Sequence, residues 1–386
     1  MRLITTMAAF ALLAAGSAHA APALELRLCP AKALHALPLA PGTRFQSLVV
    51  PNVALANMGG GEATLSEVTF DLLDKGAVVD TRRLAGDALR AAVKGGAAVE
   101  PQLGIFGFQF CDGKLLGEHP KFATTDALGA GTVALVANQT FGWKGSRDTL
   151  RITAHATRGG KAEEAQVSIP VDASTVKTPM RFPLEGRWAV VVAGTPHGGH
   201  RWALPEAFAY DIAAFGADDK SFRGDGQRFE DYYAYGAPVL AAGDGVVVEV
   251  VADQPELLEA LRRPGESFDA YGDRMGALQM KLISQGERAI GGNAVIIDHG
   301  NGEYSLYAHL KPGSIPVKTG DRVKAGQRIG ALGASGNVTE PHLHFQVCDA
   351  ASPLHCAGIP LSFTNVELPY ADGPRAIQAG DIVVAH

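Results

Sequence analysis

The chain has 386 residues, of which 47% are hydrophobic and 19% charged, and its formal net charge is −6. This composition is typical of a globular protein with substantial cores and argues against a disordered chain. The negative charge gives no support for nucleic acid or an acidic membrane surface as a partner. The length suits two domains of ordinary size.

The first twenty residues are predicted to be a secretory signal peptide. Arg2 supplies the positive start, an apolar run follows over 4–15, and Ala18-His19-Ala20 is a small-x-small cleavage signal. A membrane anchor is the alternative, but the run is shorter than the roughly 20 residues that span a bilayer. No later segment reads as a transmembrane helix. We therefore expect residues 1–20 to be removed from an exported protein that is periplasmic or secreted.

Four cysteines are present, and in an oxidising compartment an even number indicates disulfides. They are Cys29, Cys111, Cys348 and Cys356. Their distribution, two near each end, favours the pairs Cys29–Cys111 and Cys348–Cys356, with free buried thiols as the alternative. No Cys-x-x-Cys occurs, so a thioredoxin-like or zinc-ribbon protein has little support.

Residues 21–180 predict an accessory β-sandwich domain, immunoglobulin-like in type. Apolar and polar residues alternate over 68–72, 150–155 and 167–171, and Gly-rich turns separate these runs. A short helix is expected over 87–93. No catalytic constellation is apparent in this half, because its histidines are isolated and each is expected to be solvated. These histidines are His35, His119 and His155.

The segment 174–186 is the expected boundary, and residues 181–386 form the second predicted domain. Short apolar strands are expected over 238–251, 293–298, 304–309, 329–332 and 343–347. The stretch 253–291 interrupts them, and its Leu spacing predicts a helix over 255–262 that ends at Pro264-Gly265. This insertion either forms a wall of a cleft or decorates the surface.

The most informative histidines are His342 and His344. In this segment apolar Leu343, Phe345 and Val347 alternate with the two histidines and Gln346. On a strand, residues i and i+2 point to one face, so both imidazoles can serve one metal site. The alternative is the solvated polar face of an edge strand.

Further candidates precede this pair. His309 ends a predicted strand, and His197 and His200 come before Asp211, which lies in an apparently buried run. A buried carboxylate needs a metal or a basic partner, and a salt bridge, for example to Arg201, is the alternative.

Two His and one Asp suit a catalytic zinc site, which uses three protein ligands and leaves one position for water. No His-Glu-x-x-His motif is present, so the base must come from spare histidines, for which His309 and His342 are the candidates.

From about 188 to 363 the sequence resembles the M23 peptidases, the lysostaphin- and LytM-like zinc endopeptidases. The matching segments are AYDI (209–212), YGAPVLAAGDGV (235–246), GNAVIIDHG (292–300), LYAHL (306–310), VKAGQRIG (323–330) and GNVTEPHLHF (336–345). The resemblance implies an antiparallel β-sheet with a groove above it and hydrolysis of peptide bonds in peptidoglycan stems or cross-bridges.

The resemblance also implies roles for residues. Asp211 and His344 would be zinc ligands, together with a first-motif His, and His309 and His342 would flank the bound water and the developing oxyanion. The family commonly has its first ligand in His-x-x-x-Asp, whereas His200 precedes Asp211 by eleven positions. A loop must therefore return the histidine to the sheet, and we favour His200 over His197. Three other histidines are expected to lie outside the site: His299 as part of a turn, and His355 and His386 as incidental residues.

The leading hypothesis is therefore an active zinc endopeptidase acting on peptidoglycan. The first alternative is a non-catalytic module of the same fold that binds wall or activates another hydrolase. The second makes the N-terminal sandwich the functional part, as a partner- or glycan-binding domain. In either case the N-terminal domain is a candidate for contacting another protein or regulating the groove.

Overall fold

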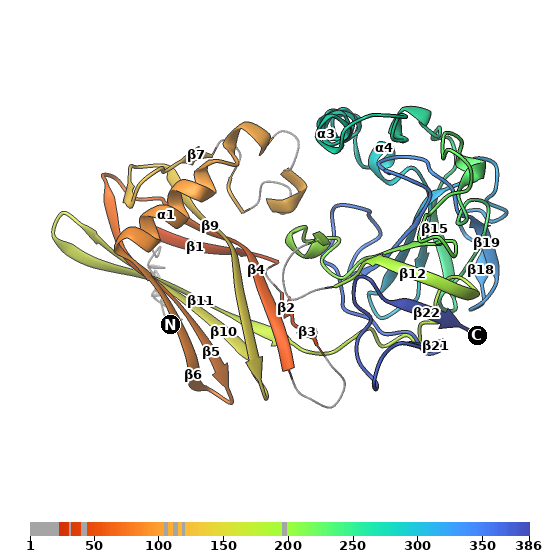
Figure 1. The fold of residues 1–386 in the computed structure, drawn as a ribbon. Coiled ribbons are helices and arrows are strands. Elements are labelled where there is room, and N and C mark those ends of the chain that lie inside the picture. The colour runs from red at the N-terminus through yellow and green to blue at the C-terminus, as the bar shows by residue number, and fades with distance from the viewer. Residues whose placement is uncertain are drawn as a thin grey trace, which may run out of the picture.

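The computed structural model describes residues 23–30, 32–39, 45–103, 107–110, 115–117, 120–194 and 199–386. The predicted signal peptide, Cys111, His119 and His197 lie outside the described residues. Within them the chain forms two mainly β domains joined by the segment between β11 (Lys161–Asp172) and β12 (Gly186–Val192) (Figure 1). The expected mostly β fold class is confirmed.

The N-terminal domain is a sandwich of two sheets. Its other strands are β1 (Leu24–Cys29), β2 (Leu34–His35), β3 (Leu37–Pro38), β4 (Phe45–Asn57), β5 (Ala63–Asp74), β6 (Ala77–Ala85), β7 (Lys121–Phe122), β8 (Ala127–Leu128), β9 (Thr132–Lys144) and β10 (Thr149–Arg158). One sheet has the order β1-β4-β9-β7, with β3 beside β4. The other has the order β2-β11-β10-β5-β6, with β8 beside β5.

The alternating pattern places the sandwich core as predicted. Phe70 on β5 lies opposite Ile152 on β10, and both side chains are buried against those of the other sheet. The expected helix is α1 (Gly86–Ala97), which packs on β9. A Cβ at Gly96 would lie 1.9 Å from the carbonyl oxygen of Leu135, so only glycine allows this close approach. Two 3₁₀ turns follow, η1 (Glu100–Gln102) and η2 (Gly107–Phe110).

The C-terminal domain is built on one long antiparallel sheet. Its strands after β12 are β13 (Tyr210–Ala213), β14 (Pro238–Leu240), β15 (Gly245–Val251), β16 (Asn293–Asp298), β17 (Tyr304–Leu310), β18 (Arg322–Val323), β19 (Arg328–Ala331), β20 (Leu343–Cys348), β21 (Val366–Glu367) and β22 (Ile382–Ala385). The sheet order is β18-β15-β16-β17-β20-β13-β12-β22-β21, and β14 and β19 form a separate ribbon. Tyr307 and Phe345 lie in the core between this ribbon and one face of the sheet. The other face of β13, β17 and β20 is left for the site.

The insertion after β15 is helical, but its main helix is not the predicted one. Residues 255–262 contain only a 3₁₀ turn, η5 (Leu258–Ala260), because Glu256 is held by hydrogen bonds from Tyr235 and from the backbone of Ala334. The long helix is α3 (Phe268–Ser284), which begins where the side chain of Ser267 caps it, and α4 (Glu287–Gly291) follows. Two further 3₁₀ turns precede the insertion, η3 (Gly199–Trp202) and η4 (Phe229–Asp231).

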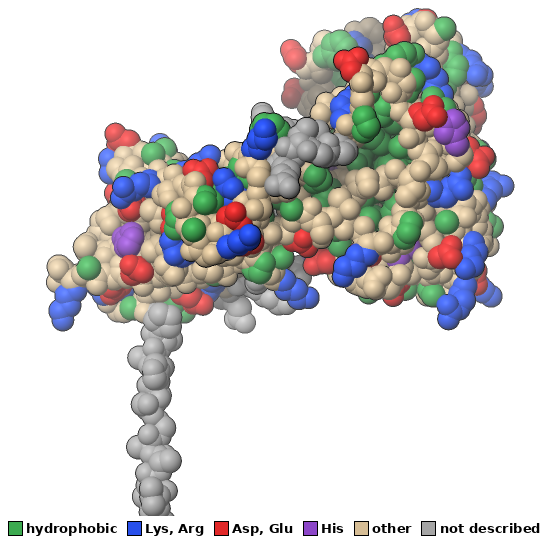
Figure 2. Space-filling view, turned by 90° about the horizontal axis from the view of Figure 1, so that it is seen from below, with side chains coloured by type: hydrophobic (Ala, Val, Ile, Leu, Met, Phe, Trp, Pro, Cys, Tyr) green, Lys and Arg blue, Asp and Glu red, His purple; other side chains and the backbone are tan. Residues whose placement is uncertain are grey.

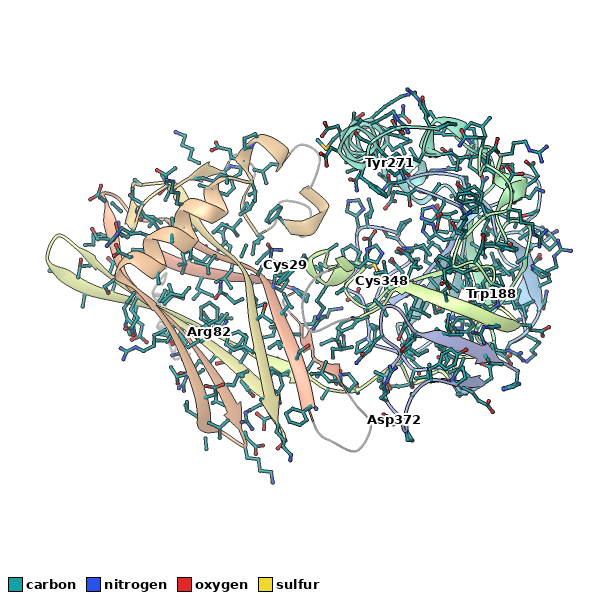
Figure 3. All side chains as sticks on the ribbon, viewed as in Figure 1. Cys29, Arg82, Trp188, Tyr271, Cys348 and Asp372 are labelled. Carbon is teal, nitrogen blue, oxygen red and sulfur yellow. A yellow bond between two sulfur atoms is a disulfide. The ribbon has the colours of Figure 1, made fainter. Side chains whose placement is uncertain are left out.

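The predicted pair Cys348–Cys356 is a disulfide. The other predicted pair lies outside the described residues, because it includes Cys111. Figure 3 shows Cys29 and Cys348 near the region where the two domains meet. Over the face seen in Figure 2, acidic and basic side chains are interspersed. Among the described residues no helix is both long and apolar enough to cross a membrane.

Candidate metal centre

Asp211 and His344 are placed side by side by strand pairing. Asp211 on β13 is directly opposite His344 on β20, and His344 Nδ1 lies 2.9 Å from Asp211 Oδ1. Leu343 and Phe345, the neighbours of His344, point into the core and are fully buried. The alternation seen in the sequence thus directs His344 to the cleft face of the sheet.

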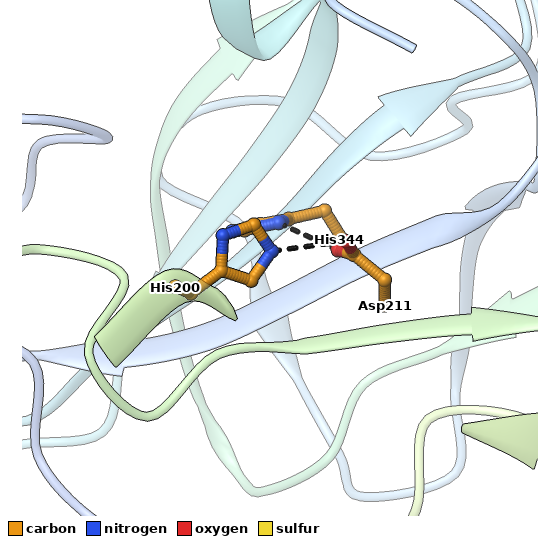
Figure 4. Close-up of side chains that lie close together, drawn as sticks. All are labelled: His200, Asp211 and His344. Carbon is orange, nitrogen blue, oxygen red and sulfur yellow. Dashed lines mark hydrogen bonds and ion pairs between the residues drawn. The ribbon is translucent and has the colours of Figure 1, made fainter. Parts of the chain in front are cut away.

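His200 reaches the same point from η3, which lies outside the sheet. Its Nε2 is 2.9 Å from Asp211 Oδ2, although eleven positions separate the two residues (Figure 4). One nitrogen of His200, one nitrogen of His344 and one carboxylate oxygen of Asp211 all lie within 4.8 Å of one another. The suggested salt bridge from Asp211 to Arg201 does not form, because the guanidinium donates instead to the carbonyl of Ser47.

A second layer of polar groups fixes which nitrogen each histidine presents. Glu206 Oε2 lies 3.0 Å from Nδ1 of His200, so this nitrogen carries a proton and Nε2 is the nitrogen that faces Asp211. The side-chain amide of Gln346 donates to the carbonyl of Pro353, and its oxygen lies 2.8 Å from Nε2 of His344. Nε2 of His344 is therefore the N–H donor, and Nδ1 is left as a ligand atom. The sequence analysis assigned no role to Glu206 or Gln346.

His309 and His342 lie beside this group. Nδ1 of His309 is 2.9 Å from the carbonyl oxygen of Ser335, and Nδ1 of His342 is 2.8 Å from that of Glu340. A carbonyl only accepts, so each Nδ1 carries a proton, and in the neutral tautomer of such a ring the lone pair is on Nε2. Nε2 of His342 lies 3.6 Å from Asp211 Oδ1, and the ring centroids of His309 and His342 are 4.9 Å apart.

The backbone around His309 is tightly constrained. His309 has φ 63°, in the left-handed region that residues other than glycine rarely adopt. Two glycines allow the backbone segments around the Ser335 carbonyl to approach closely. A Cβ at Gly292 would lie 2.4 Å from the Ser335 oxygen, and a Cβ at Gly336 would lie 2.5 Å from the Ile290 oxygen. Packing around these glycines therefore supports a strained conformation at His309.

The charges of the site are compatible with a bound cation. Burial favours neutral acids here, but His342, His200 and His344 hold the pKa of Asp211 well below its usual value. Burial likewise opposes the charge of Glu206, yet the hydrogen bond from His200 keeps its pKa below the ordinary value. Among the described residues, only histidines form ion pairs with the buried Asp211 and the half-buried Glu206. Two negative charges and two imidazole lone pairs match one divalent cation, and this donor set is typical of zinc.

His309 differs in charge from the candidate ligands. Burial, with added repulsion from His342 and His344, lowers the pKa of His309 well below its usual value, so its ring is neutral. In the metal-free protein burial opposes the charge of His200, but Asp211 and Glu206 outweigh it and raise the pKa of His200 to about 10.

The five candidate site residues line a cleft of about 550 Å³. Helix α3 forms one wall through Gly272, Met275, Gly276, Gln279 and Ile283, so the insertion shapes the cleft rather than decorating the surface. The loop before His342 adds neutral polar groups to the lining. These are Asn337 and Thr339.

The remaining described histidines lie outside this cleft. His299 has both ring nitrogens engaged, 2.8 Å from the carbonyl of Asp244 and 2.7 Å from the hydroxyl of Ser305. Exposed or half-buried carboxylates pair with the others: Asp172 with His35, Glu164 with His155, Glu287 with His355 and Glu367 with His386.

Residues 275–355 match the family model of Peptidase family M23. Peptidoglycan DD-endopeptidase ShyC of Vibrio cholerae serotype O1 is 34% identical over 145 residues, which cover 37% of this chain and 23% of that protein. ShyA, a peptidoglycan DD-endopeptidase of the same organism, is 44% identical over 73 residues, or 18% and 16% of the two chains. The chain thus spans less than a quarter of the length of these curated relatives.

Two solved structures are also similar. The catalytic domain of the prophage-encoded M23 protein EnpA from Enterococcus faecalis is 19% identical, covers 48% of this chain and 95% of its own, and gives a TM-score of 0.27. The catalytic domain of lysostaphin from Staphylococcus simulans is 22% identical, covers 42% and 95%, and gives a TM-score of 0.22. The family model and the curated relatives thus identify a domain of the M23 peptidase type in the C-terminal region of this chain.

Proposed function

We propose that this chain is an exported zinc metallo-endopeptidase that hydrolyses peptide bonds in the stem peptides or cross-links of peptidoglycan. The observation that carries the proposal is the separation of under 4.8 Å among the candidate ligand atoms of His200, Asp211 and His344. The polar groups behind both histidines support it, because each leaves a lone pair free on the ligand nitrogen.

These three residues would hold the ion. A bound zinc supplies a Lewis acid for the scissile carbonyl and a water that ionises near pH 7. His309 is assigned as the base, since its neutral ring accepts the water proton at Nε2 and passes it to the leaving amine. His342, when protonated, keeps Nδ1 on the carbonyl of Glu340 and presents Nε2–H to the oxyanion.

The lining of the cleft supports a neutral peptide as the substrate. Apart from the five site residues and Glu206, the described lining consists of glycine, alanine, apolar side chains and the neutral groups of Gln279, Asn337, Thr339 and Gln346. Amide and hydroxyl groups of this kind hydrogen-bond a peptide backbone, and small residues leave room for short side chains such as alanine. The curated relatives ShyA and ShyC are named as peptidoglycan DD-endopeptidases, which agrees with this substrate class.

The alternative is a wall-binding or hydrolase-activating module without catalysis. Digestion of purified wall sacculi, with the fragments identified by mass, separates the two functions. We expect about one zinc per chain and release of cleaved cross-links by the wild type, with both lost in His344→Ala. A wild-type protein that binds sacculi but releases no fragments, even with zinc bound, would support the alternative.

A further inference from the structure

The loop that carries His200 is anchored differently from the other candidate ligands. Asp211 and His344 lie on paired strands, so the hydrogen bonds of the sheet fix their positions. His200 lies in η3, a turn of four residues, and turns rather than strands connect it to β13. Other contacts must therefore hold this histidine beside Asp211.

Those contacts come from the N-terminal sandwich. Arg201, the residue after His200, is 4% exposed, and its Nη2 donates to the carbonyl oxygen of Ser47 on β4 at 3.3 Å. Its guanidinium also lies 4.3 Å from the ring centroid of Phe208, at the other end of the loop. Arg201 thus links the start of the loop to β4 and packs on the residue near the loop's other end.

Apolar contacts extend this anchor. Leu37 on β3 forms a buried cluster with Ala207 and Phe208. Leu204 packs against a second sandwich cluster, which includes Leu115. A void of about 30 Å³ lies between the loop and the sandwich and is lined from both sides, and Leu204 also borders a larger cleft of about 820 Å³ between the two domains. The loop therefore has two faces, one packed on the sandwich and the other presenting His200 and Glu206 to the cleft.

A buried arginine without a carboxylate partner is costly, which argues that its position serves a purpose. No ion pair of Arg201 is found among the described residues, and within them its Nε has no hydrogen-bond partner. A charge buried in this way is tolerated when the surrounding structure needs its geometry. Ordering the ten residues between His200 and Asp211 also costs conformational entropy, which the sandwich contacts offset.

We propose that the N-terminal domain is a structural part of the metal centre and that Arg201 is a positioning residue, which holds η3 so that His200 meets Asp211. This inference rests on the proposed function of His200 as a zinc ligand. It predicts that weakening the contact between the domains lowers zinc affinity, although no ligand is changed.

The test measures zinc dissociation constants of the full chain by competition with a chromogenic chelator. We expect Arg201→Leu to bind zinc at least roughly tenfold more weakly, the range found when groups that orient a ligand are lost. Arg201→Lys, which keeps a charged donor, should recover part of the affinity. Arg82→Leu is the matched control, because Arg82 lies over Phe141 at the same 4.3 Å but within the sandwich, away from the other domain (Figure 3).

A second variant acts from the other side of the contact. Leu37→Ala removes packing against Phe208 without altering the peptidase domain, and it should weaken zinc binding in the same direction even if Arg201→Leu does not fold. Wild-type affinity in folded Arg201→Leu or in Leu37→Ala would overturn the inference. Absence of zinc binding in the wild type would instead overturn the proposed function, so the two failures are distinguishable.

Discussion

Replacing Glu206 tests whether the second layer of the site tunes the metal. Glu206 accepts a hydrogen bond from Nδ1 of His200 at 3.0 Å and is half-buried. Glu206→Gln keeps an acceptor oxygen but removes the charge, and Glu206→Ala removes both. We expect both variants to fold and to lose zinc affinity, Ala more than Gln.

The magnitude follows from the type of bond. A hydrogen bond to a charged group contributes about 1.5–3 kcal/mol, and 1.4 kcal/mol corresponds to a factor of ten in an equilibrium constant. Glu206→Ala should therefore weaken zinc binding roughly 10- to 100-fold, which agrees with the measured effect of losing such orienting groups elsewhere. For Glu206→Gln we expect the lower end of this range, because the tautomer of His200 is still fixed by the amide oxygen.

Zinc affinity is measured by chelator competition, and turnover by release of fragments from sacculi at saturating zinc. The matched control is Glu287→Gln, since Glu287 also pairs with a histidine nitrogen, His355 Nδ1, at 3.0 Å but lies outside the cleft lining. Equal zinc affinity in the wild type and Glu206→Ala would refute the reasoning. An equal loss in Glu287→Gln would show that the effect is not local to the site.

Two further predictions concern proton transfer and pH. His309→Ala should keep its zinc yet lose about 100- to 10,000-fold in turnover, the usual contribution of a general base; near-normal cleavage would contradict the role of His309. In the metal-free protein the pKa of His200 is about 10, so its contribution to stability is complete below about 6.5 and disappears as the pH rises through 10. Zinc uptake at pH 7 must then release at least one proton, which calorimetry in buffers of different ionisation enthalpy measures; zinc binding without proton release would refute the pKa shift.

The strands and the paired histidines were predictable because their signals are local. Alternation over 343–347 depends only on the period of a strand. The structure places Leu343 and Phe345 in the core and directs His344 to the cleft. The disulfide between Cys348 and Cys356 was equally predictable from the sequence, since the two residues are near one another in the chain.

Helix α3 and Glu206 show where local signals were insufficient. The apolar spacing of Met275, Leu278 and Leu282 was present in the sequence, but Gly272 and Gly276 lower helix propensity. The helical Leu spacing over 255–262 was the stronger local pattern, but tertiary hydrogen bonds to Glu256 prevent a helix there. Glu206 has no periodic context at all, because it lies in a loop whose path depends on contacts with another domain. Its role becomes visible only when His200 is placed beside Asp211.

The unusual spacing between His200 and Asp211 and the presence of the sandwich have one physical explanation. In a His-x-x-x-Asp motif both residues lie close together along the chain, so local backbone geometry brings the histidine to the carboxylate. With a separation of eleven positions, local geometry no longer suffices, and the loop must be fixed from outside. Here Phe208 packs on Leu37 of the sandwich, and Arg201 donates to the Ser47 carbonyl. Glu206, which lies between them in the loop, pairs with His200. The extra residues therefore make metal affinity depend on the docking of both domains, rather than on the peptidase sheet alone.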